Sequence, residues 1–264
     1  MATLTAAEIK NYREKGFVIP DFKISEQKLK KLRSALEQTL TDNPKVRPEQ
    51  LASIHTPKAG PDDTVGHSAF LEVALDEELV ELVSCILGDD VIMWGAQLFC
   101  KPGSDGMEVP MHQDGQYWPI RPLATCTIWL AIDDSDRDNG CLQVSPGSHR
   151  TGIHYNHKTE ARDNLVLNQA IDDPRLKDMV TEYVELEAGQ LSLHDVFLVH
   201  GSSPNTSGKR RAGFTVRYMP SSSVLRREMK IPFAGYPVDW AEKPLWLAKG
   251  RDLSGENDFE RGHN

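Results

Sequence analysis

The segment MHQDGQYW, residues 111–118, places an imidazole and a carboxylate two positions apart, at His112 and Asp114. In a β-strand, residues i and i+2 project from the same face, so these side chains would lie side by side while Gln113 points away. Polar side chains inside a sheltered barrel must be paired or must bind something. The pair therefore offers two metal ligands at one edge of a strand; a surface pair on an edge strand is the alternative.

A third ligand would have to come from elsewhere in the chain, and His200 is the best candidate. It ends the apolar stretch VFLVH and opens the polar stretch GSSPN, which predicts a position at the mouth of a strand. Two histidines and one carboxylate on one side of a metal, with the other positions open, form the facial triad of non-haem Fe(II) oxygenases. The open positions would admit a cosubstrate and O2.

The segment GKRRAGFTVRY, residues 208–218, adds a candidate for binding a dicarboxylate cosubstrate. Arginine suits the far carboxylate because its planar fork holds a carboxylate bidentately. Arg211 starts the next strand and could return beside the metal, whereas alternation puts Arg210 on the opposite face. Arg217 shares the face of Arg211 and could contact substrate; an exposed or salt-bridged arginine is the alternative.

Polar and aromatic residues directly follow the first two ligands, at Gln116, Tyr117 and Trp118. A loop here would hang over the open coordination face, so one of these residues is expected to contact substrate. Trp118 could instead pack beneath the loop. A small basic cluster after the last strand could draw an anionic substrate to the mouth, or could simply be solvated: Arg226, Arg227 and Lys230.

The other histidines are expected to be structural or solvated. His194 shares a face with His200 if one unbroken strand runs through residues 190–200, and a turn at Asp195-Val196 would take it elsewhere. We expect a structural role for it. The sequence favours a turn-stabilising role for His149, the histidine of PGSH. It favours solvent exposure for His154 and His157, which lie in a polar insert.

These residues need a β-rich scaffold, and the chain after Gly88 provides the pattern for one. Apolar, β-branched and aromatic stretches alternate with turn signals, with no regular helices between them. That pattern argues against a parallel βαβ sheet and favours an antiparallel sandwich or jelly roll. The predicted strands are 91–100, 125–133, 140–148, 179–189, 190–200 and 212–220.

The first third of the chain is expected to be helical. Thr5 and Glu8 fit a capping box, and Gly16 a helix stop. Ser25 could cap a second helix with leucines at helical spacing, and a third helix is expected over 71–87. The proline-rich stretch 43–66 is predicted to be a loop. We expect one domain, 1–264, with helical additions (1–90), a β-helix core (91–220) and an irregular C-terminal cover (221–264).

Composition limits the partners and the compartment. The chain has 264 residues and a net charge of −9, with no basic stripe, which argues against nucleic acid. No stretch resembles a signal peptide or approaches the roughly 20 apolar residues of a membrane span. Four scattered cysteines indicate buried thiols in a reducing compartment. We therefore expect a cytoplasmic protein that acts on a small molecule, with no membrane attachment and no obligate protein partner.

Several of these motifs together resemble the phytanoyl-CoA dioxygenase family. They are GFVIPDF (16–22), HQD (112–114), PGSH (146–149) and HGSSPNTSGKRR (200–211), in that order along the chain. The resemblance implies a mainly β fold, the double-stranded β-helix (a jelly roll like that of the cupins), with N-terminal helices packed on the barrel. It also implies Fe(II), 2-oxoglutarate as cosubstrate, and O2.

The resemblance also implies roles for particular residues. His112, Asp114 and His200 would be the iron ligands, and Arg211 would bind the C5 carboxylate of 2-oxoglutarate. Four more residues are assigned to the cosubstrate pocket: Ser202, Trp129, Gln97 and Thr127.

The implied reaction is hydroxylation of an unactivated C–H bond of a small, polar metabolite, with release of succinate and CO2. Asp114 favours hydroxylation over halogenation, because halogenating relatives carry a small residue there. Desaturation or cyclisation could begin from the same chemistry. A 2-oxoglutarate-independent cupin-type enzyme and a non-catalytic binding protein are further alternatives.

Overall fold

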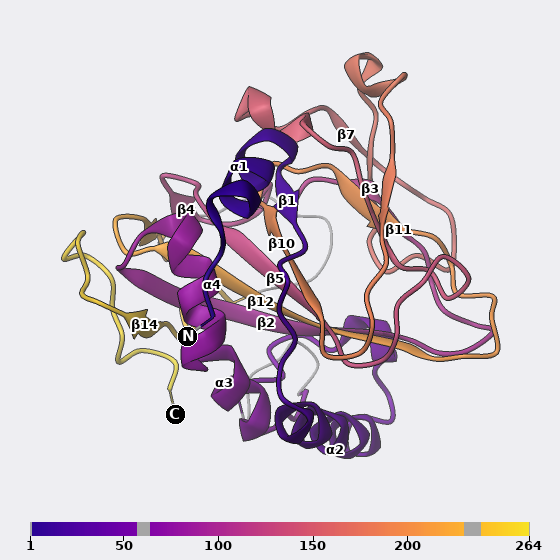
Figure 1. Ribbon diagram of the computed structural model, residues 1–264, viewed down its shortest axis with the longest axis horizontal. Coiled ribbons are helices and arrows are strands. Elements are labelled where there is room, and N and C mark those ends of the chain that lie inside the picture. The colour runs from indigo at the N-terminus through magenta and orange to yellow at the C-terminus, as the bar shows by residue number, and fades with distance from the viewer. Residues whose placement is uncertain (1, 57–63, 230–238, 264) are drawn as a thin grey trace.

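The computed structural model describes residues 2–56, 64–229 and 239–263 (Figure 1). Lys230, the last member of the predicted basic cluster, lies outside these ranges, as do Pro232 and Pro237 of the predicted C-terminal cover. Figure 1 shows strands β2 (Val91–Lys101) and β12 (Arg211–Pro220) crossing the molecule, with helices α2 (Glu26–Asp42) and α3 (Ser68–Ala74) below them.

The N-terminal helices begin and end close to where their capping residues predict. Helix α1 (Ala6–Lys15) has the capping box of Thr5 and Glu8 and ends at Gly16, whose φ of 86° favours glycine. Ser25 caps α2 by accepting a hydrogen bond from the Lys28 amide. The prediction of a single helix over 71–87 is wrong. The segment forms two helices, α3 and α4 (Glu77–Leu87), because the Asp76 side chain caps the start of a new helix.

The strands form two facing antiparallel sheets, which confirms the predicted mainly β jelly roll. The large sheet has the order β1-β10-β5-β12-β2-β14, and the small sheet has the order β3-β11-β6-β9. Two further two-stranded sheets, β13-β4 and β7-β8, complete the described sheet structure. The remaining strands are β1 (Phe17–Val18), β3 (Val109–His112), β4 (Ile120–Arg121), β5 (Cys126–Ala131), β6 (Leu142–Val144), β7 (His157–Thr159), β8 (Gln169–Ile171), β9 (Glu182–Val184), β10 (Leu191–Asp195), β11 (His200–Ser202), β13 (Val224–Leu225) and β14 (Trp246–Lys249).

Alternation along β5 and β12 gives the large sheet an apolar face and a polar face. On β12, Phe214, Val216 and Tyr218 are buried in the main core against the helices. Arg211 and Arg217 project to the other side, toward the small sheet. The same alternation on β5 puts its even-numbered residues in the helix-side core and its odd-numbered residues on the inner side. The inner face of this sheet is thus free to carry polar groups.

Three predicted strands are shorter in the structure than expected. The stretch 190–200 is two strands, β10 in the large sheet and β11 in the small sheet. A turn separates them, in which the Asp195 carboxylate accepts a hydrogen bond from the Phe197 amide at 2.8 Å. Strand formation over 179–189 is confined to β9, and over 140–148 to β6. Turn chemistry ended each strand earlier than apolar content indicated.

Two regions expected to be irregular take part in the sheet. In the predicted loop 43–66, residues Pro48–Gln50 form a 3-10 helix and Ala52 bridges to Gln97 of β2. In the predicted C-terminal cover, β14 pairs with β2 as an edge strand. No helix among the described residues is long and apolar enough to cross a bilayer.

Candidate metal centre

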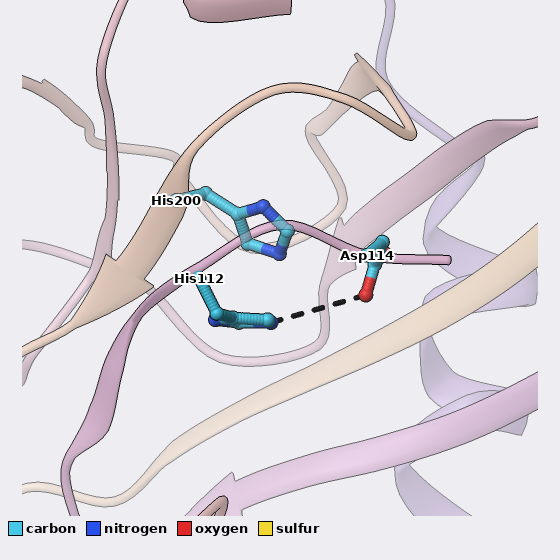
Figure 2. Close-up of side chains that lie close together, drawn as sticks. All are labelled: His112, Asp114 and His200. Carbon is cyan, nitrogen blue, oxygen red and sulfur yellow. Dashed lines mark ion pairs between the residues drawn. The ribbon is translucent and has the colours of Figure 1, made fainter. Parts of the chain in front are cut away.

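His112, Asp114 and His200 converge at one end of the small sheet. His112 ends β3 and pairs directly with His200, the first residue of β11, while Asp114 lies in the turn just beyond β3. One ligand atom from each residue lies within 4.8 Å of the other two. His112 Nε2 and Asp114 Oδ1 are 3.8 Å apart, and Figure 2 shows all three side chains pointing toward one another.

Both imidazoles are oriented by their own backbone. The Nδ1 of His112 donates to the carbonyl of Pro110 at 2.8 Å, and the Nδ1 of His200 donates to the carbonyl of Leu198 at 2.9 Å. Each bond leaves Nε2 unprotonated and directed at the centre, as outer partners of metal-binding histidines do. Burial lowers the pKa of each imidazole to about 4, so both are neutral at pH 7.

The carboxylate completes a donor set that suits iron. Burial alone would raise the pKa of Asp114, but His194 and His200 hold it well below its usual range. At neutral pH the group is therefore an anion between two neutral imidazoles. Two imidazole nitrogens and one carboxylate oxygen fit the facial donor set of mononuclear Fe(II) sites.

The three residues open onto a cavity of about 640 Å³ between the two sheets. The cavity volume is within the range of small-molecule sites. The residues predicted to bind cosubstrate or to contact substrate also line it, from both sheets and from the loop after β3: Gln97, Gln116, Tyr117, Trp118, Thr127, Trp129, Ser202, Arg211 and Arg217. Arg226 and Arg227 of the predicted basic cluster do not line this cavity, and Arg226 pairs with Glu256.

Arg211 is a buried cation on the cavity wall. Only 2% of it is exposed, and its guanidinium lies 5.2 Å from the ring of Trp129. Its Nη2 donates to the carbonyl of Gly140 at 2.8 Å, whereas its buried Nε has no partner among the described residues. Burial lowers the pKa of Arg211 to about 10, which leaves it charged at pH 7. Arg210, as alternation requires, lies on the other face and pairs with Asp133 at 2.8 Å.

The residues around Arg211 leave a polar group free to bind a ligand and hold Trp129 in place beside the guanidinium. The hydroxyl of Thr127 is buried and has no partner in the described part of the chain. Gly213 makes room for Trp129, since a Cβ at that glycine would lie 2.1 Å from the indole. Ser202 is buried in β11, and Gln97 is partly buried in β2.

Arg217 faces the cavity and is neither exposed on the outer surface nor salt-bridged to a described residue. Its guanidinium lies 5.4 Å from the ring of Trp118 and 6.0 Å from that of Trp94. Its Nη2 makes a long hydrogen bond, 3.5 Å, to the Gln97 Oε1. Trp118 both packs on Trp94 and lines the cavity.

The expectation that His154 and His157 are solvated is wrong. His154 donates from Nε2 to the Asp114 carbonyl at 2.8 Å. His157 accepts from the Gln113 amide at 3.1 Å, contacts Gln116 at 2.7 Å and lines the cavity. The polar insert therefore folds back over the ligand turn. Its composition contains no local signal of this, because the contacts span about 40 residues.

His194 and the PGSH segment lie close to the ligands. The predicted turn at Asp195 exists, yet His194 stays beside the centre, with its Nε2 3.9 Å from the Asp114 Oδ2. At that distance the contact is too long for a hydrogen bond, and neither buried ring nitrogen has a hydrogen-bond partner among the described residues. In PGSH, the Ser148 hydroxyl accepts from the Val199 amide at 2.8 Å, next to His200, and His149 Nε2 contacts the carbonyl of Arg13 in α1.

The C-terminal segment contributes to the cavity in a way that sequence reasoning missed. Lys243 lines the cavity, although no motif around it in the sequence indicates a binding role. The other lining residues of this segment are Asp239, Trp240, Glu242 and Pro244.

Two facing sheets around a cavity that gathers two imidazoles, a carboxylate and a buried arginine define the double-stranded β-helix class of metal-dependent oxygenases. Residues 12–213 match the model of the phytanoyl-CoA dioxygenase (PhyH) family. The match covers most of the chain, so the chain belongs to that family. It is an Fe(II)- and 2-oxoglutarate-dependent dioxygenase, whose cofactors are Fe(II), 2-oxoglutarate and O2.

Individual relatives agree with this assignment. The peroxisomal phytanoyl-CoA dioxygenase of Mus musculus is 28% identical over 291 residues, which cover 96% of this chain and 83% of the relative. Among solved structures, the apo form of the non-haem monooxygenase ThoJ has a TM-score of 0.72 at 22% identity, covering 96% of this chain and 87% of that one. The carbocyclase SnoK has a TM-score of 0.64 at 23% identity, covering 84% and 87%. At these identities the solved structures show the shared fold.

Proposed function

We propose that the chain hydroxylates an unactivated C–H bond of a small, polar metabolite. One oxygen atom of O2 would enter the substrate as a hydroxyl group, and the other would enter succinate as 2-oxoglutarate loses CO2. The observation that carries this proposal is the convergence of His112, Asp114 and His200 beside the buried Arg211 in one cavity. We also propose that residues 1–264 form a single domain around this cavity.

In this proposal His112, Asp114 and His200 hold Fe(II). Bound iron supplies the activation of O2 that the organic side chains cannot provide. The protein contributes neutral imidazoles, a fixed anion and exclusion of bulk water. The backbone bonds to both Nδ1 atoms support this role, because they present Nε2 as the donor atom.

Arg211 would bind the far carboxylate of 2-oxoglutarate, supported by its burial and by the unpartnered Nε. The buried hydroxyls of Thr127 and Ser202 would complete that end of the pocket. Trp129 would hold Arg211 from one side through the contact between ring and guanidinium. Gln97 lies between this end and Arg217, on the neighbouring strand.

The substrate would enter from the side of the loop after β3. Gln116, Tyr117 and Trp118 line the cavity there, and Arg217 lies against Trp118. Asp114 supports hydroxylation over halogenation, since its carboxylate occupies the ligand position that a halide would need. Cyclisation or desaturation is the second candidate reaction. The similarity in fold to the carbocyclase SnoK supports this candidate.

Succinate formation tests the class of reaction. Purified protein is incubated with Fe(II), 2-oxoglutarate, O2 and a metabolite panel, with iron or cosubstrate omitted in parallel. We expect succinate only in the complete mixture, with product mass increased by one oxygen atom. Loss of two hydrogen atoms would identify desaturation or cyclisation. Oxidation without succinate would indicate a 2-oxoglutarate-independent enzyme, and the absence of any product would indicate a binding protein.

A further inference from the structure

Two cations share the outer part of the cavity wall, away from Arg211. Arg217 projects from β12, and Lys243 reaches the same wall from the C-terminal segment before β14. Neither has an ion-pair partner among the described residues. Among the residues that the structure describes, the buried Nε of Arg217 has no hydrogen-bond partner, and the Nζ of Lys243 donates to the Ser53 hydroxyl alone, at 3.0 Å.

The backbone register brings these two cations together. Arg217 pairs across the strands with Gly95 of β2. A Cβ added at Gly95 would lie 3.8 Å from the Nζ of Lys243. The ammonium group of Lys243 therefore lies against Gly95, which has no side chain. Lys243 and Arg217 therefore approach the cavity over neighbouring strands.

This arrangement is electrostatically unfavourable when nothing negative lies beside it. Burial lowers the pKa of Arg217, and burial together with Arg217 lowers the pKa of Lys243 to about 8. The carboxylates that line the cavity offset this charge only in part. Asp114 attracts Arg217 but also belongs to the metal centre, while Asp239 and Glu242 are exposed. An anion bound between the two cations would remove this penalty.

Aromatic walls flank the two cations. Trp94 lies 4.5 Å from Trp118 and 6.2 Å from Trp240, measured between ring centroids, and all three indoles line the cavity. Arg217 lies against two of them. Indoles offer a flat apolar surface, so the site combines two positive charges with room for a hydrophobic group.

We propose that Arg217 and Lys243 bind an anionic group of the substrate, a carboxylate or a phosphate, while its apolar part lies among the tryptophans. This inference rests on the proposed function and specifies its substrate class. The planar fork of Arg217 matches either anion bidentately, and Lys243 adds a point charge. In the inner part of the cavity, the charges of Fe(II), Asp114, dianionic 2-oxoglutarate and Arg211 cancel. The two outer cations remain for the substrate.

Binding of small acids to the enzyme loaded with Fe(II) and 2-oxoglutarate, without O2, tests the proposal. Each aliphatic or aryl carboxylic acid in a panel is titrated alongside its primary amide, and each phosphate monoester alongside its alcohol. Tryptophan fluorescence reports binding. We expect the best anion to bind at least tenfold more tightly than its neutral analogue. The two arms of the panel show whether carboxylate or phosphate is preferred.

Variants connect the preference to the two residues. Arg217→Gln and Lys243→Gln are each expected to reduce the preference for the anion by at least tenfold. Arg210→Gln and Lys249→Gln are the matched controls, because both residues form ion pairs outside the cavity and should leave the preference intact. Circular dichroism checks folding of each variant. If one cation variant fails to fold, the other still tests the site.

Equal binding of acids and amides, no binding by any anion, or an unchanged preference in both cation variants would overturn the proposal. These outcomes are separate from failure of the proposed function. That failure would appear in the wild-type enzyme as the absence of iron-dependent succinate formation, whichever ligands bind.

Discussion

The two walls of the cavity supply different chemistry by different structural means. The small sheet supplies the candidate metal ligands, from the ends of the short strands β3 and β11 and the turn after β3. The large sheet supplies the cations, from alternate positions of the long strand β12. Each histidine ring on the small sheet is held by a carbonyl two residues before it, whereas Arg211 is held by a carbonyl 71 residues away.

This difference shows how a single fold separates metal binding from organic recognition. Local backbone contacts fix the imidazoles, so their geometry depends mainly on the turns at the strand ends. Strand alternation fixes the arginines, so their direction depends on register across the large sheet. Substitutions on the two walls are therefore expected to impair different binding steps.

The largest expected effect is on the small sheet. His200→Ala should weaken Fe(II) binding by more than about 100-fold, since loss of an outer partner alone costs roughly 10- to 100-fold. Metal analysis and anaerobic Fe(II) titration measure this, and circular dichroism should show an unchanged fold. His263→Ala is the control, because His263 lies outside the cavity lining. Normal iron affinity in the His200 variant would remove this residue from the centre.

The matching substitution on the large sheet is Arg211→Gln. It should raise the KM for 2-oxoglutarate by at least about 30-fold, since truncating one partner of a buried charge pair costs roughly 2–5 kcal/mol. Iron affinity should change far less. Arg210→Gln, one residue earlier on the opposite face, should leave KM unchanged. Equal losses of iron and cosubstrate affinity in the Arg211 variant would contradict the separation of the two walls.

The pH dependence of binding sharpens the comparison between the inner and outer cations. Lys243, with a pKa of about 8, is protonated at pH 7 and loses its charge as pH rises. Affinity for an anionic ligand should fall about tenfold from pH 7 to pH 9. Arg217 keeps its charge over this range because arginine is effectively always protonated. The neighbouring His55 stays neutral because burial holds its pKa well below its usual value. Two exposed acidic residues, Asp239 and Glu242, also line the cavity near Lys243.

The same titration on Lys243→Gln should be flat. The 2-oxoglutarate KM should not follow the Lys243 curve, because Arg211, with a pKa of about 10, remains charged through pH 9. A steep fall that persists in Lys243→Gln would assign the effect to another group.

A smaller effect on stability and cosubstrate binding is expected from Gly213→Ala, which changes packing on the large sheet without replacing a charged residue. The new methyl group would meet the indole of Trp129 and displace it from Arg211. We expect a loss of about 1–3 kcal/mol in the free energy of unfolding and a rise of a few fold in the 2-oxoglutarate KM. Thermal unfolding and steady-state kinetics measure these. Gly208→Ala, where the added Cβ meets nothing, should be neutral.

Much of the large sheet was predictable because the segments that form β2, β5 and β12 are apolar, rich in β-branched and aromatic residues, and bounded by turn signals. Helix ends were predictable where a side chain caps them, as at Thr5 and Ser25. The break before α4 was missed, since apolar spacing continues across the capping Asp76. The division of 190–200 between two sheets was left open, because a turn made by one aspartate interrupts an apolar run without changing its composition.

The amino-acid sequence by itself determined the donor types, the spacing of His112 and Asp114, and the opposite directions of Arg210 and Arg211. Each follows from chemistry and alternation within a few residues. Only the tertiary structure decided that His157 lies over the ligand turn, that His194 lies beside Asp114, and that Lys243 joins Arg217. These contacts join segments far apart in the chain. They depend on how sheets pack and strands pair, which local pattern does not encode.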